Sequence, residues 1–236
     1  MYNPSKQTYY NPNIEYIFNN EIIEYDMKNA GINIIQHFKL LPQDQVDKLL
    51  NLDKTERHIA VGKLQRNDKG LSSAMSEKFA EMRGLFVSAN NLSVDNIISV
   101  KKDAIYTVGS CQNLKFGKVE FIPKNRYSSY IRFTDSMNIE IYYNPRGTDI
   151  KGIGESGVNK HRLYMLHFLS KIVSYLETKN ASLKIFLRSF IDQYKGMELD
   201  AGYYIEFNNM SRELNPMYNY QNVLIPLVQI SLKEMG

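Results

Sequence analysis

The sequence predicts an α+β protein in which an antiparallel sheet of about five strands is flanked by N-terminal and C-terminal helices. Three observations predict this class. Apolar residues recur at helical spacing over much of 27–89, short β-type runs follow over 96–143, and helical spacing returns after residue 163. Helices and strands that are segregated along the chain, instead of alternating, are typical of α+β proteins.

The part before residue 90 predicts one strand and several helices. Residues 21–26 form a β run that ends on Asp26, and 27–41 follow at helical spacing until Pro42. Residues 46–50 predict a short helix, and 54–66 predict a basic one. The longest helix is expected over 71–89, where apolar side chains recur every three or four residues: Leu71, Met75, Phe79, Met82, Phe86 and Ala89.

Five strands are predicted in succession, over 96–101, 104–108, 118–122, 127–133 and 138–143. Because turn-forming residues and short links separate most of them, we expect an antiparallel meander. A glycine-rich connector over 147–157, helices over 163–176 and 183–194, and short β-like pieces after 202 complete the chain. We therefore expect an irregular arm over 1–20, helices plus the sheet over 21–146, and a helical part over 147–236 that packs on the same core.

Composition limits the class of protein. With 236 residues, 43% of them hydrophobic and 23% charged, the chain has the composition of a globular protein, which excludes wholesale disorder. The single cysteine, Cys111, excludes an internal disulfide and favours a reducing compartment. No apolar run approaches the ~18 residues of a membrane span and no secretory signal is seen. We expect a cytoplasmic protein, in the host cell if it is viral, with no membrane partner.

Two aspartates stand out by their context. Asp26 ends a predicted strand that leads directly into a helix, and Asp103 lies at the junction of two predicted strands. A strand end and a neighbouring hairpin can bring two carboxylates together, which is what Mg²⁺ ions need in order to clamp the oxygens of phosphoryl transfer. Aspartate at a strand end also serves as a turn or helix-capping residue. Both interpretations stay open at this point.

The residues around both aspartates resemble the palm motifs of single-subunit polymerases. Asp26 followed by Gly31-Ile32 looks like the first palm motif. Val100-Lys-Lys-Asp103-Ala-Ile-Tyr-Thr is similar to the hairpin motif of phage-type RNA polymerases and family A DNA polymerases, with Lys102 where those families have His. The resemblance implies a reduced or degenerate palm-like fold and two-metal nucleotidyl transfer. Asp26 and Asp103 would then be the catalytic residues and the Mg²⁺ ligands.

Basic and aromatic residues suggest a nucleic-acid partner. The basic stretch over 54–66 and the tyrosine-rich strands are typical of surfaces for single-stranded nucleic acid, where bases stack on rings and cations follow the phosphates. The alternative is a solvated helix and a sheet that packs its tyrosines. On the first interpretation, four cations would contact phosphates: Arg57, Lys63, Lys101 and Lys102.

Three functions follow from these features. The first is a palm-like, nucleic-acid-associated protein, either a Mg²⁺-dependent nucleotidyltransferase or an inactive derivative of one. The alternative is a non-catalytic, phage-encoded factor that docks on nucleic acid or on a phage or host protein and needs no metal. The third is a structural or assembly component, a function that requires a stable fold but no particular site residues. Net charge, at +4, permits phosphate contacts without requiring them.

Overall fold

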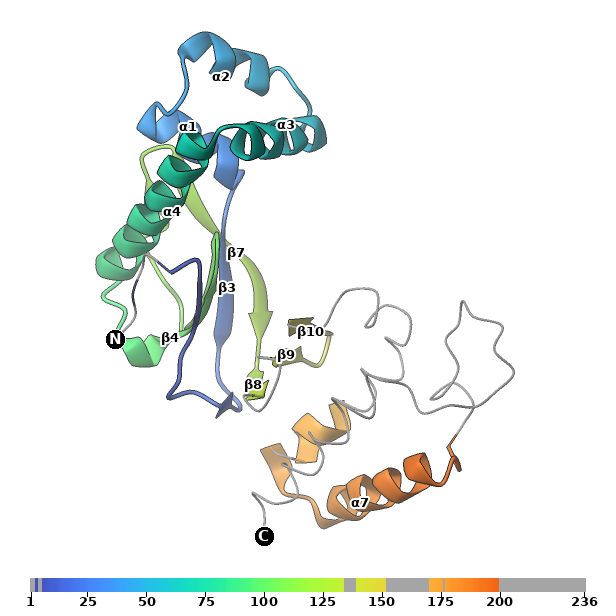
Figure 1. Cartoon of the computed structure of the whole chain (residues 1–236). Coiled ribbons are helices and arrows are strands. Elements are labelled where there is room, and N and C mark those ends of the chain that lie inside the picture. The colour runs from blue at the N-terminus through green and yellow to red at the C-terminus, as the bar shows by residue number, and fades with distance from the viewer. Residues whose placement is uncertain (1–2, 4–5, 134–138, 152–169, 176, 200–236) are drawn as a thin grey trace. The chain divides into compact units, whose positions relative to one another are not determined.

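The computed structural model describes residues 3, 6–133, 139–151, 170–175 and 177–199 (Figure 1). The chain divides into two compact units. The first combines Met1–Ile14 with Glu21–Arg126, and the second combines Glu15–Asn20 with Tyr127–Gly236. The domain limits expected from the sequence, after residues 20 and 146, stay a prediction.

The first unit contains a six-stranded sheet in the order β1-β4-β5-β3-β7-β6. Its central strand, β3, is buried along almost its whole length, although its six residues, Ile22–Met27, include the carboxylates of Glu24 and Asp26. Antiparallel pairing joins β3 to β5, β5 to β4 and β4 to β1. The strands are β1 (Thr8–Tyr10), β3 (Ile22–Met27), β4 (Ile97–Lys101), β5 (Ala104–Val108), β6 (Lys115–Phe116) and β7 (Val119–Tyr127).

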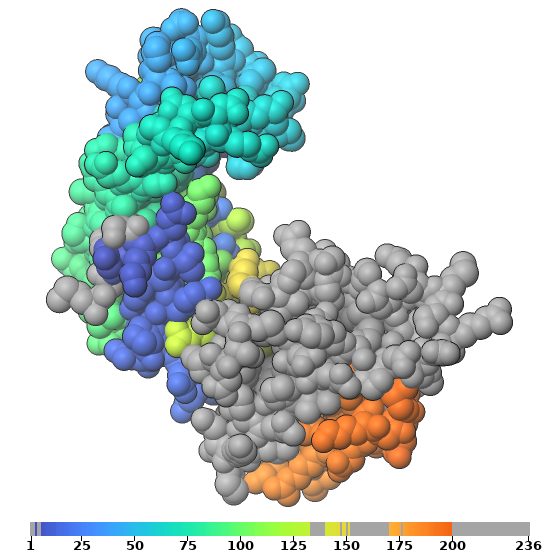
Figure 2. All heavy atoms as spheres, viewed as in Figure 1, coloured from blue at the N-terminus to red at the C-terminus, as the bar shows by residue number. Residues whose placement is uncertain are grey.

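Helices fill the interval between β3 and β4. They are α1 (Ala30–Phe38), α2 (Gln43–Leu50), α3 (Lys54–Asn67) and α4 (Lys69–Ala89), followed by a 3₁₀ turn, Val94–Asn96. A capping box fixes the start of α3, because the Asp53 side chain accepts hydrogen bonds from the backbone N–H groups of Thr55 and Glu56. Helices α1 to α3 gather at one end of the first unit, whereas α4 runs along the sheet (Figures 1 and 2).

The apolar row of α4 forms the core of the first unit together with the sheet. The Phe86 ring lies 4.4 Å from the ring of Phe121 on β7 and 5.3 Å from that of Tyr25 on β3, measured between centroids. The Tyr25 hydroxyl accepts a hydrogen bond of 2.7 Å from the backbone N–H of Cys111. Burial raises the pKa of the Cys111 thiol, so the only cysteine stays protonated in the core.

The second unit carries a four-stranded antiparallel sheet in the order β10-β9-β8-β2. These strands are β2 (Tyr16–Ile17), β8 (Ser129–Phe133), β9 (Ile139–Asn144) and β10 (Gly147–Lys151). Helix α7 (Ala181–Lys195) follows, and residues 170–175 are also helical. The α+β class is thus confirmed, with the strands divided between two sheets.

Two details of the second unit differ from the sequence prediction or lie beyond it. The first five residues of the expected connector form strand β10, because Pro145 and Arg146 turn the chain back and Gly147 pairs with Asn144 on β9. The β-like pieces predicted after residue 202, and the beginning of the helix predicted over 163–176, fall outside the described residues. Within the described residues, no helix has the length and apolar character needed to cross a membrane.

Candidate functional site

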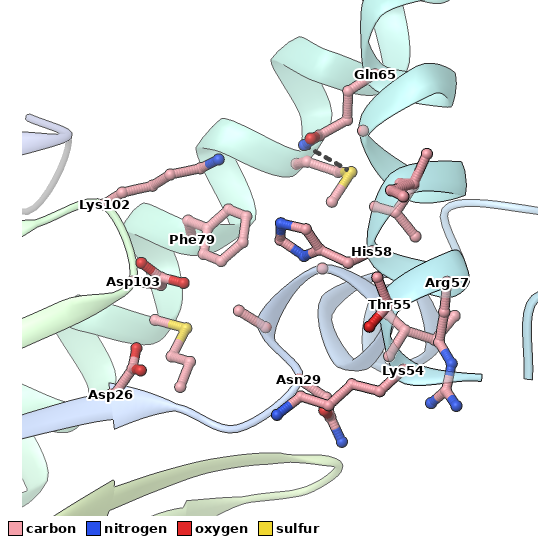
Figure 3. Close-up of a pocket in the computed structure, with 18 residues that line it drawn as sticks. Asp26, Asn29, Lys54, Thr55, Arg57, His58, Gln65, Phe79, Lys102 and Asp103 are labelled. Atoms are coloured by element: carbon pink, nitrogen blue, oxygen red, sulfur yellow. Dashed lines mark hydrogen bonds between the residues drawn. The ribbon is translucent and has the colours of Figure 1, made fainter. Parts of the chain in front are cut away.

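The end of β3 and the β4–β5 hairpin place Asp26 and Asp103 side by side. Asp26 pairs in register with Ala104, the residue after Asp103, and the Met27 N–H donates a hydrogen bond of 3.0 Å to the Asp103 carbonyl oxygen. Lys102 and Asp103 are the two residues that link β4 to β5. Both carboxylates lie on the same side of one pocket (Figure 3). The structure therefore brings together the two aspartates that the sequence singled out.

Asp26 does not cap helix α1. The N-cap of α1 is Asn29, whose backbone is left-handed (φ 47°) and whose side chain forms no capping hydrogen bond. Strand β3 continues through Asp26 to Met27. The capping interpretation of Asp26 is therefore wrong, because two residues separate Asp26 from the helix cap.

Charge repulsion and burial act on the acidic pair. Burial raises the pKa of the Asp103 carboxyl, and the neighbouring Asp26 raises that pKa further, while the cations Lys102 and Lys124 act in the opposite direction. Lys124, on β7, places its ammonium 2.9 Å from Asp26 Oδ2. That hydrogen bond raises the pKa of Lys124. The two carboxylates thus share a site that favours additional positive charge.

The pocket has a volume of about 650 Å³ and two chemically different walls. Asp26 and Asp103 stand on one side, and helix α3 faces them with polar and cationic side chains (Figure 3). Three α3 residues, Lys54, Thr55 and His58, line that second side. Apolar residues also line the pocket: Val61 on α3, and Met75 and Phe79 on α4. The lining thus combines acidic, cationic and apolar side chains.

The four cations predicted to contact nucleic acid are distributed unevenly. Lys102 lines the pocket beside Asp103, and Arg57 also lines it. The Arg57 guanidinium, however, points away from the aspartates and donates a hydrogen bond of 2.9 Å to the Leu52 carbonyl (Figure 3). The Lys101 ammonium lies 3.5 Å from the centroid of the Tyr10 ring, and Lys63 is exposed on α3 away from the pocket lining.

Sequence reasoning missed two groups of site residues. Lys124 is 98 residues from Asp26 along the chain, and only the order of strands β3 and β7 in the sheet brings the two together. A local signal existed for Lys54 and His58, because residues four apart share one face of a helix. That spacing indicates a shared helix face, but nothing in the sequence indicates that this face lies opposite the aspartates.

The donor set of the site suits only some metal ions. Among the described residues, no cluster of three or more His, Cys, Asp or Glu side chains is arranged to hold an ion. Mg²⁺ is typically held by one or two carboxylates together with substrate phosphates, which matches the Asp26–Asp103 pair. Zinc requires His or Cys ligands, which this pair does not offer.

Comparison with known proteins assigns the chain to a family. The model of a protein family described as Bacteriophage PBS1 gene 130 protein matches residues 1–233. The match covers residues of both units. No curated protein matches the chain.

Proposed function

We propose that this chain, which belongs to the Bacteriophage PBS1 gene 130 protein family, is a nucleic-acid-associated phage protein that uses Asp26 and Asp103 for Mg²⁺-dependent nucleotidyl transfer. One observation carries the proposal. Two carboxylates from a strand end and an adjacent hairpin turn line a single pocket whose opposite wall carries Lys54, Thr55 and His58. The resemblance of both aspartate motifs to those of polymerase palms supports the same chemistry.

The electrostatics of the pair fit a bound divalent cation. Repulsion from Asp26 and burial both disfavour the ionised form of Asp103. A divalent cation between the carboxylates would offset that repulsion, and substrate phosphate oxygens would complete its coordination. Bound Mg²⁺ would supply charge stabilisation for the attacking and leaving oxygens of phosphoryl transfer.

The remaining pocket residues fit the other parts of a nucleotide. Lys54, His58 and Lys102 offer hydrogen-bond donors at the rim, where phosphate oxygens would lie. Phe79 is largely buried, and the part of it that lines the pocket offers apolar surface for a base. The volume of about 650 Å³ lies within the usual range for a small-ligand site.

The full chain, incubated with primed DNA and RNA templates, nucleoside triphosphates and Mg²⁺, tests the proposal. We expect primer extension that stops when EDTA removes the ion. Titration calorimetry with Mg²⁺ alone gives a second measurement, which is independent of the choice of template. An absence of extension on every template, together with an absence of Mg²⁺ binding, would overturn the proposed function.

A non-catalytic nucleic-acid-binding factor is the second candidate. It is favoured by the ion pair between Lys124 and Asp26, which already neutralises one carboxylate, and by the absence of a third acidic ligand among the described residues. This function predicts oligonucleotide binding that weakens steeply as salt rises, because bound counterions are released. Binding of this kind without extension in Mg²⁺ would favour the factor over the enzyme.

Replacement of Lys124 by Met is expected to tighten Mg²⁺ binding by about tenfold, which is roughly 1.4 kcal/mol. The reason is that the Lys124 ammonium occupies Asp26 Oδ2 at 2.9 Å and competes with the ion for that oxygen. Lys28→Met is the matched control, because Lys28 pairs with Glu120 at 3.2 Å and does not line the pocket. Calorimetric titration of both variants measures the effect. Weaker Mg²⁺ binding in Lys124→Met would show that Lys124 assists the ion instead of competing with it.

A further inference from the structure

A fully buried arginine contacts the turn that carries Asp103. Arg83 lies on α4 among the apolar residues that face the core, and its exposed fraction is 0%. Guanidinium groups are almost never fully buried unless they are paired, because they lose hydration. Two partners of Arg83 are main-chain carbonyls: Nη1 donates to Lys102 at 2.5 Å, and Nη2 donates to Lys6 at 3.2 Å. One side chain thus joins α4, the β4–β5 turn and the N-terminal segment.

The residue that Arg83 holds has an unfavourable backbone. Lys102 has φ +48°, in the left-handed region that side chains other than those of Gly, Asn and Asp rarely adopt. Such a conformation persists only where the surroundings impose it, and it is concentrated at functional sites. Here the Lys102 N–H donates a hydrogen bond of 2.6 Å to the Gln7 carbonyl, and the Lys102 carbonyl accepts the one from Arg83. Both backbone polar groups of Lys102 are therefore held from outside the hairpin.

The N-terminal segment takes part in the same arrangement. Strand β1 pairs antiparallel with β4, with Thr8 opposite Lys101. The Gln7 side chain donates a hydrogen bond of 3.0 Å to Ser76 Oγ on α4. On the other side of the turn, the Asp103 carbonyl accepts the hydrogen bond from Met27. The main chain of the Lys102–Asp103 turn is thus fixed by three separate parts of the first unit.

We propose that Arg83, together with residues 6–8, is a positioning device that holds the Asp103 carboxylate beside Asp26 against their mutual repulsion. The fixation of Asp103 does not depend on any ion. The contribution of the fixed Asp103 carboxylate to Mg²⁺ binding rests on the proposed function. Arg83 is a positioning residue because it contacts the carbonyl of the neighbouring Lys102 and acts on Asp103 through the backbone.

Arg83→Met tests this device, because Met keeps an unbranched apolar stem of similar length but donates no hydrogen bond. We expect the amide exchange rates of Met27 and Lys102 to rise by about tenfold relative to amides in the middle of β3 and β5. We also expect Mg²⁺ affinity to fall by about tenfold, the lower end of the range for outer-shell partners of a metal ligand. Arg83→Lys, which keeps the charge and one donor, is expected to restore part of both losses.

Leu71→Ala is the matched control, because Leu71 is buried on α4 but does not line the pocket. It should lower global stability without a selective rise in exchange at Met27 or a change in Mg²⁺ affinity. If the amides of Met27 and Lys102 exchange no faster in Arg83→Met than in the wild type, the positioning role of Arg83 is overturned, whether or not the affinity for Mg²⁺ changes. If the wild-type chain neither binds Mg²⁺ nor extends a primer, the proposed function fails, and selective exchange at Met27 in Arg83→Met still supports the fixation of the turn by Arg83.

Discussion

Asp103→Asn is expected to reduce Mg²⁺-dependent nucleotide incorporation by on the order of 10³-fold while making the metal-free protein more resistant to urea. The loss follows because the amide cannot supply the negative charge that holds the cation beside Asp26. Primer extension under saturating nucleotide measures this effect. Asp26→Asn should show a similar loss of incorporation without the gain in stability, because Asp26 also loses its ion pair with Lys124.

The gain in stability follows from the raised pKa of Asp103. Burial and the Asp26 charge raise this pKa above the ordinary value of 3.8, so the folded protein binds the proton more tightly than the unfolded chain does. Below pH 3.8 the Asp103 carboxyl is protonated in both the folded and the unfolded state, so it does not lower the free energy of unfolding. Between pH 3.8 and the higher pKa of the folded state, the unfolded chain is ionised while the folded protein still holds the proton, so stability falls as the pH rises, and the full loss persists at pH 7. Asparagine removes the cost, since it does not ionise.

Urea denaturation of the wild type and Asp103→Asn at a series of pH values measures this change in stability. The midpoint of Asp103→Asn should exceed that of the wild type at pH 7, and the difference should narrow as the pH falls towards 3.8. A variant that unfolds more easily than the wild type at pH 7, yet still incorporates nucleotide, would contradict both parts of the prediction.

Phe86→Ala is expected to lower the free energy of unfolding by about 3–5 kcal/mol, the largest effect on stability that we predict for a single core residue. The Phe86 side chain is fully buried, and its ring packs between those of Tyr25 and Phe121. Alanine would leave a cavity between α4 and the sheet, next to Tyr25 on β3, the strand that carries Asp26. Guanidinium denaturation monitored by circular dichroism measures the loss.

Leu85→Ala is the control for this prediction. Leu85 is the preceding residue of the same helix, and 41% of it is exposed. Its replacement should change the free energy of unfolding by no more than about 0.5 kcal/mol. If Phe86→Ala cost no more than Leu85→Ala, the packing of α4 against β3 and β7 would not be the core of the first unit.

Elements with strong local periodicity were predictable from the sequence. The apolar row from Leu71 to Phe86 predicted α4 nearly to its ends, because one face of the helix is buried along its length. Strand β1 was not predictable, since Thr8–Tyr10 is short and owes its conformation to pairing with β4, far along the chain. Likewise, the boundary between the two units falls between Arg126 and Tyr127, which both belong to strand β7, and a boundary inside a strand leaves no turn signal in the sequence.

The candidate site was predictable in its acidic half only. Asp26 and Asp103 could be found because each lies at the end of a recognisable β run. Lys124 and Arg83 could not be found, because their roles come from contacts across the sheet and between helix and turn. In the sequence, Arg83 is a polar residue that interrupts an apolar helical pattern. Its hydrogen-bond partners are backbone carbonyls, which every residue carries, so the sequence does not identify them.

The chain passes from one unit to the other three times, at residues 14, 20 and 126. Neither unit is therefore a contiguous stretch that could be excised as an expression fragment. A fragment that starts at residue 127 would lack β2, in which Tyr16 pairs with Ile131. During synthesis on the ribosome, residues 15–20 must wait, unpaired, until most of the first unit has emerged. Completion of the second unit thus depends on a contact of very long sequence separation, a topology that slows folding.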